Sequence, residues 1–309
     1  MTSGQNTAPA PLLVAAVAPR TAGGALLDLR GLKALAHAAE RAGLDAVLLG
    51  DGTADAPAAF EGTTATAALA AATEHIGLLL RTPPGDLAPY HLARITASLD
   101  HLSRGRAGWC ATGTGPGTAA AAEYLHVVKG LWESFDADAF VHDRAGGVYW
   151  RLDGLHRLDH TGEHYTVAGP LNVARPPQGH PVTAVTDPAL AAGADLLLLE
   201  TDDPAEAGRI RTRVRKEALD AGRDADALKV AFTLPAGAGA DEIAEWCAGQ
   251  VADGFVVPLT APDDPFLTTT ADGLRRRGLL RDPATAGTTL RDRLGLAHPA
   301  SRLAAAAAS

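Results

Sequence analysis

Short apolar runs recur along the chain, and they alternate with segments whose apolar residues follow the helical repeat of about 3.6 residues. Each run is almost free of charged residues, which is typical of buried parallel strands. The runs predict strands at 12–17, 46–49, 76–80, 107–111, 182–185, 196–199, 230–234 and 255–259. Because eight strands alternate with helices, the pattern predicts an α/β fold, a (β/α)8 TIM barrel that forms a single domain over residues 1–309.

The helical segments carry the residues that favour helix ends. The clearest helix is predicted at 90–102, where apolar residues recur at helical spacing and Gly105 follows the last turn. Asp28 is a predicted N-cap, and Gly43 is expected to end the same helix. Further helices are predicted at 66–72, 118–135, 204–221, 241–252 and 266–280, with a very short one after Asp187.

Residues 136–180 interrupt the alternation, because they contain no long periodic element. We therefore predict an irregular insertion after the fourth helix. Three histidines in it, at 156, 160 and 164, are four residues apart, a spacing that would align metal ligands on a helix. Gly162 interrupts any such helix, so we predict no metal site. Residues 297–309 are expected to form a tail.

The composition limits the classes of function. The 309 residues are 47% hydrophobic and carry a net charge of −9. An acidic chain is unsuited to nucleic acid, because phosphate backbones bind basic surfaces. Its two cysteines, Cys110 and Cys247, give no disulfide framework. No secretory signal and no apolar stretch of roughly 20 residues is visible, so we expect a cytoplasmic protein that does not bind a membrane.

A polar loop rich in glycine, Thr-Gly-Thr-Gly-Pro-Gly-Thr at 112–118, follows the predicted strand 107–111. Ligands of parallel α/β folds bind beyond the carboxyl ends of strands. Alternating glycines can present backbone amides to a phosphate. The spacing is not that of the dinucleotide-binding fingerprint, and we favour a shortened connection as its explanation.

Several stretches together resemble one enzyme family. PYHLARITASLDHLSRGRAGW at 89–109 is similar to the flavin-dependent monooxygenases of the bacterial-luciferase superfamily, in the branch of nitrilotriacetate and dibenzothiophene-sulfone monooxygenases. AERAGLDAVLLGDG at 39–52, VVKGLWESFDADAFVHDRAGGVYW at 127–150, HRLDHTGEHYTVAGPLNVARPPQGHPV at 156–182 and LRRRGLLRDPATAGTTLRDRLGL at 274–296 also match, in unbroken order.

The resemblance implies a bacterial two-component monooxygenase that oxidises a small organic substrate with reduced FMN and oxygen. A separate flavin reductase would supply the reduced FMN, which would bind at the carboxyl ends of the barrel strands. The insertion at 136–180 would then pack over this mouth of the barrel. The resemblance also implies a homodimer, or a heterodimer with another luciferase-like chain.

The resemblance places five residues at the FMN site: Asp51, Cys110, Thr112, Gly113 and Thr186. Asp51 would lie beside the flavin, although a loop aspartate that bonds its own backbone is an alternative. Cys110 stands where the family has an asparagine in a Gly-Trp-Asn motif, and the alternative that we favour is a small buried residue that packs in the core. No residue is assigned a catalytic role.

Other family features are replaced in this chain. A Gly-x-Ser loop that holds the flavin phosphate is replaced by Thr186-Asp187-Pro188, which adds a negative charge and removes an amide donor. These changes leave an alternative function open, that of a non-catalytic luciferase-like partner subunit that has lost its flavin site. A related barrel that uses a deazaflavin is a third alternative.

Overall fold

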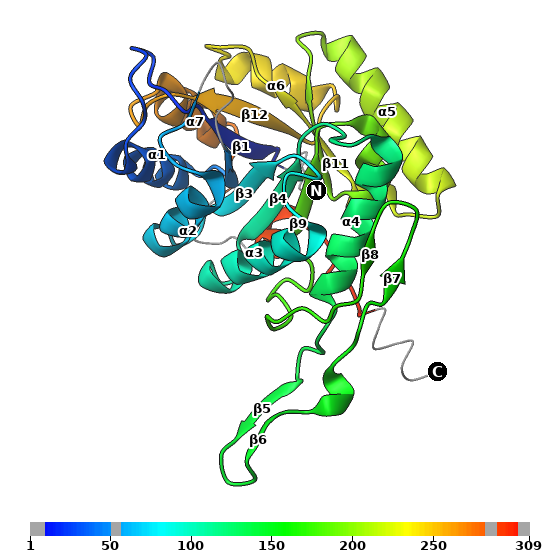
Figure 1. Ribbon diagram of the computed structural model, residues 1–309. Coiled ribbons are helices and arrows are strands. Elements are labelled where there is room, and N and C mark those ends of the chain that lie inside the picture. Colours follow the sequence, from blue (N-terminus) through cyan, green and yellow to red (C-terminus); the bar gives the residue numbers. More distant parts are fainter. Residues whose placement is uncertain (1–9, 51–56, 282–288, 302–309) are drawn as a thin grey trace, which may run out of the picture.

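The predicted barrel is confirmed. A computed structural model describes residues 10–50, 57–281 and 289–301 of the chain. Eight parallel strands close into a barrel in the order β1-β12-β11-β10-β9-β4-β3-β2 (Figure 1). They are β1 Leu12–Val17, β2 Ala46–Gly50, β3 Gly77–Thr82, β4 Ala107–Ala111, β9 Val182–Val185, β10 Leu196–Glu200, β11 Lys229–Thr233 and β12 Gly254–Leu259. All eight coincide with predicted strands, and their ends differ from the predicted ends by two residues at most.

Helices surround the barrel (Figure 1). They are α1 Leu29–Ala42, α2 Gly62–Ala72, α3 Pro89–Leu102, α4 Thr118–Trp132, α5 Pro204–Asp220, α6 Ala240–Ala248, α7 Thr269–Arg276 and α8 Leu290–Leu294, with a short 3-10 helix at Pro188–Gly193. The end signals in the sequence act as expected at α1. Asp28 accepts a hydrogen bond from the Gly31 amide at 2.7 Å, and Gly43 adopts a left-handed φ of 91°.

The core has two layers. Side chains that alternate along the strands pack either inside the barrel or between the sheet and the helices. Trp109 and Trp132 belong to the outer layer and are 0% and 1% exposed. The inner layer includes Leu290 and Leu294 of α8, a helix that the sequence pattern did not predict. This short helix therefore closes the amino-terminal end of the barrel.

The insertion lies elsewhere than predicted. Helix α4 runs antiparallel to the strands, so the chain leaves it at the amino-terminal end of the barrel rather than at the mouth. Gln178 confirms this position, because its side chain donates to the carbonyl of Ala107, the first residue of β4, at 2.7 Å. The expectation that residues 136–180 cover the mouth is corrected accordingly.

Two small hairpins make up most of the insertion (Figure 1). Strands β5 Phe140–Asp143 and β6 Val148–Trp150 form the first, which projects away from the barrel and is followed by a 3-10 turn at Leu152–Gly154. Strands β7 His160–Thr161 and β8 Thr166–Val167 form the second, which lies beside α4. In the part of the chain described here, we find no helix long and apolar enough to cross a membrane.

Candidate functional site

The candidate site is the mouth of the barrel, where the eight strands end. Leu79, Cys110 and Ala184 belong to the inner core layer, so their side chains face the barrel axis. Residues two positions further along each strand project to the same side, at the level of the mouth. This rule places Arg81, Thr112, Thr186, Glu200 and Thr233 around the mouth.

Two of the predicted site residues are brought together. The Gly113 amide, in the loop after β4, donates a hydrogen bond to Thr186 Oγ1, after β9, at 3.0 Å. The Thr186 amide in turn donates to the Ala111 carbonyl at 3.2 Å. Because the Thr186 oxygen already accepts a bond from the protein, its hydroxyl hydrogen remains available to donate to a ligand.

The residues after Thr186 form a tight helix start. Asp187 is the N-cap of the short helix at Pro188–Gly193, and its Oδ1 accepts from the Ala189 amide at 2.8 Å. Pro188 has no amide hydrogen to offer. One donor at this helix start is therefore absent and another is bound to a carboxylate, so the helix start is poorly suited to a phosphate.

Arg81 is a mouth residue that the sequence pattern did not single out. Its guanidinium is exposed, and it makes no hydrogen bond or ion pair with any residue in the described ranges. Gly50 of the neighbouring strand makes room for it, since a Cβ at that position would lie 2.8 Å from the Arg81 Cβ. Arg81 therefore supplies a positive charge to a mouth that also holds the carboxylates of Asp187 and Glu200.

Cys110 lies beside Arg81 on the neighbouring strand, in the inner core layer, and it is fully buried. Burial raises the pKa of its thiol to about 12, although the positive charge of Arg81 acts in the opposite direction. The thiol therefore stays protonated at neutral pH, and a protonated, inaccessible thiol is a poor nucleophile. Its position is that of a small packing residue in the floor of the mouth.

Asp51, the remaining predicted site residue, lies outside the described residues. Among the described residues, no group of three or more potential metal ligands is close enough to hold an ion. Two of the three histidines at 156, 160 and 164 have other side-chain partners. His156 pairs with Asp136 at 2.9 Å, and His160 pairs with Glu123 at 2.8 Å.

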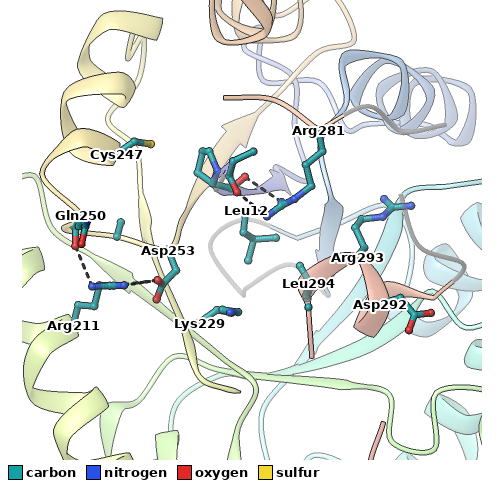
Figure 2. A pocket seen from close by; sticks show the side chains of 14 residues that line it. Leu12, Arg211, Lys229, Cys247, Gln250, Asp253, Arg281, Asp292, Arg293 and Leu294 are labelled. Carbon is teal, nitrogen blue, oxygen red and sulfur yellow. Dashed lines mark hydrogen bonds and ion pairs between the residues drawn. The ribbon is translucent and has the colours of Figure 1, made fainter. Parts of the chain in front are cut away.

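A polar pocket of about 570 Å³ lies at the opposite end of the barrel (Figure 2). Arg211 binds Asp253 there at 2.8 Å, and Arg281 donates to the Pro11 carbonyl at 3.2 Å. Lys229, at the start of β11, also lines this pocket. Residues at the amino-terminal face of such barrels usually serve stability, so we place the candidate site at the mouth.

Comparisons with known proteins agree with the fold. Residues 11–246 match the family model described as luciferase-like monooxygenase. The solved structure of EDTA monooxygenase from Chelativorans sp. BNC1 superposes with a TM-score of 0.81 at 21% identity, covering 94% of this chain and 99% of that chain. This structural likeness shows the barrel fold.

Comparisons of amino-acid sequence find relatives of higher identity than this solved structure. The B-type subunit of pristinamycin IIA synthase from Streptomyces pristinaespiralis is 52% identical over 295 residues, which cover 95% of this chain and 97% of that protein. The A-type subunit of the same synthase is 36% identical over 140 residues, 40% of this chain and 29% of that protein. Nitrilotriacetate monooxygenase component A of Aminobacter aminovorans is 41% identical over 140 residues, 40% of this chain and 31% of that protein.

Proposed function

The chain belongs to the luciferase-like monooxygenase family, and we propose that it takes part in the FMN-dependent oxidation of a small organic substrate, with a separate reductase supplying reduced FMN. The family match spans the strands from β1 to β11. It includes the two mouth loops that the hydrogen bond between Gly113 and Thr186 connects. This meeting of two loops at the mouth is the observation that carries the proposal. We further propose a bacterial cytoplasmic location, which two free cysteines favour.

The donors at the mouth fit an anionic cofactor. Arg81 offers a guanidinium that pairs with no residue in the described ranges, and Thr186 offers a hydroxyl hydrogen that its bond from Gly113 leaves available. The carboxylate of Asp187 opposes an anion beside Thr186. We therefore expect this site to bind FMN, but more weakly than a loop with free backbone amides would. Each charge-assisted hydrogen bond that such a loop would add contributes about 1.5–3 kcal/mol.

In this proposal each mouth residue has a limited task. Arg81 attracts and orients the anion, Thr186 donates a hydrogen bond to it, and Thr112 is a further polar contact. Cys110 and its apolar neighbours in the inner core layer form a dry floor that excludes water from below. Bound reduced FMN supplies the electrons for oxygen activation, and that chemistry belongs to the cofactor.

An anaerobic titration with reduced FMN tests this proposal. We expect saturable binding by the purified chain, and at least a tenfold weaker affinity in Arg81→Met. The control variant is Arg209→Met, because Arg209 is an exposed residue of α5 outside the mouth. Absence of reduced FMN binding by the chain, both alone and with a luciferase-like partner present, would refute an FMN function.

The similarity to one subunit of a two-chain synthase favours a second candidate function, that of the partner subunit in a pair of luciferase-like chains. The relative covers nearly the whole chain, and its name assigns it to a synthase with a second, related subunit. The Asp187-Pro188 helix start agrees with a subunit whose own flavin site is weakened. Binding of reduced FMN only by the pair, and not by this chain, would support this function over the first.

A further inference from the structure

The first hairpin of the insertion exposes an unusual amount of apolar surface. We call residues 136–156, which contain β5, β6 and the 3-10 turn, the arm. Five of the nine large apolar side chains that the described residues expose lie in it: Val141, Val148, Tyr149, Trp150 and Leu152. Tyr149 is 61% exposed and Leu152 is 77% exposed. Such concentration on one segment is typical of an interaction surface.

The root of the arm packs against the buried Phe135, which follows α4. Phe135, which is buried, contacts Phe140 at a ring distance of 4.9 Å and Trp150 at 5.6 Å. Asp136 and His156 are joined by a 2.9 Å hydrogen bond beside them. Beyond this root the arm is a two-stranded hairpin that extends away from the barrel (Figure 1). Two-stranded hairpins are marginally stable in water, so the outer part gains most from a partner.

A groove of about 670 Å³ lies beside the arm. It is lined by aromatic side chains of the arm, together with Arg175 and His101. The Nη1 atom of Arg175 is buried and has no hydrogen-bond partner within the described ranges.

The charges of the arm limit the partner. The arm carries both acidic residues, among them Asp138, Asp143 and Asp153, and the basic residues Arg144 and Arg151. Arg151 pairs with Asp138 at 2.9 Å. A surface of mixed sign does not attract a polyanion or an anionic membrane. Apolar and aromatic residues with interspersed charges of both signs are instead typical of protein interfaces.

We propose that the arm and its groove bind a sister luciferase-like chain, the A-type subunit of the pair. This inference rests on the pairing put forward above as the second candidate function. A sister chain of the same fold can approach around a pseudo-twofold axis, which lets the arm of each chain pack against the groove of the other. Tyr149 and Leu152 then become buried anchors.

The experiment measures binding of the full chain to the purified A-type subunit of pristinamycin IIA synthase, by sedimentation velocity and calorimetry. The test variant is Tyr149→Ser with Leu152→Ser. Leu219→Ser is the matched control, because Leu219 is 58% exposed but lies on α5. We expect a one-to-one complex, a dissociation constant at least tenfold higher in the test variant, and no change in the control. The single variant Leu152→Ser replaces the double one if the latter has a lower melting temperature.

Each outcome has a distinct meaning. If the wild-type chain binds the sister chain and the arm variant binds it equally well, the arm is not the interface, although the pairing stands. If the wild-type chain does not bind the sister chain, the pairing itself is refuted. If it instead forms a dimer with itself that the arm variant abolishes, the occupant is a second copy and the proposed sister chain is wrong.

Discussion

Thr186 Oγ1 and the Gly113 amide, 73 residues apart in sequence, form a 3.0 Å hydrogen bond that ties together two loops at the mouth of the barrel. The bond fixes the rotamer of Thr186 and directs its remaining hydrogen away from the loop. We predict that Thr186→Val raises the dissociation constant for reduced FMN by about tenfold or more, since a bond to a charged group contributes about 1.5–3 kcal/mol. Thr186→Ser keeps the hydroxyl and should bind as the wild type does; equal affinity in the valine variant would contradict the assignment.

Asp187 should weaken phosphate binding through its charge rather than its shape. Asp187→Ser keeps an N-cap oxygen for the Ala189 amide and removes the negative charge. We predict about a threefold to tenfold tighter binding of FMN, on the order of 1 kcal/mol, with a stronger effect at low salt. The matched control is Asp224→Ser, because Asp224 caps another short helix at the opposite end of the barrel. Calorimetry at two salt concentrations would reveal an unchanged affinity, which would place the phosphate elsewhere.

The barrel could be predicted because its signals are local. Each buried strand carries its own apolar run, and Asp28 and Gly43 mark the ends of α1 within a few residues of sequence. Helix α8 has five residues, too few for a periodic pattern, so it was missed. The position of the insertion depends on the end of the barrel at which α4 finishes, which is a property of the assembled fold.

The site was only partly predictable, because its contacts join segments that are far apart in the sequence. Gly113 and Thr186 follow predicted strands, so they could be proposed from sequence, but their contact spans 73 residues. Arg81 looks like a charge at the end of an apolar run. Its position beside Cys110 follows only from the register of β3 with β4. The assignment of these residues to FMN remains a prediction.

Trp132 anchors α4 to α3 in the outer core layer. Its indole Nε1 donates to the Ala93 carbonyl at 3.1 Å and to Thr96 Oγ1 at 3.2 Å. We predict that Trp132→Ala lowers the free energy of unfolding by roughly 3–5 kcal/mol, because it leaves a large cavity and unpaired groups. Trp150→Ala is the control, because Trp150 is 38% exposed on the arm, and its effect should be less than half as large. Urea unfolding measures both; similar values would show that the α3–α4 contact is misjudged.

Glu123 should make the second hairpin of the insertion sensitive to acid. Its carboxylate accepts hydrogen bonds from His160 at 2.8 Å and from the amides of His164 and Tyr165 at 2.9 Å. These bonds, above all that from His160, lower the pKa of Glu123 from 4.5 to about 2. A carboxyl group whose pKa is lower in the folded state stabilises the fold at pH values above its unfolded pKa, and this stabilisation is lost as the pH falls through the folded pKa.

The pH window follows from these values. The Glu123→Gln variant keeps one acceptor oxygen but has no charge to titrate. The difference in unfolding free energy between wild type and variant should therefore be constant above about pH 5, and it should shrink as the pH falls from 4.5 towards 2.

Amide hydrogen exchange at His164 and Tyr165 should speed up in the variant at neutral pH, because the hairpin loses its charged acceptor on α4. Glu217→Gln on the exposed face of α5 is the control and should leave both measurements unchanged. A difference that stays constant down to pH 3 would mean that this carboxylate is not held by the hairpin in solution.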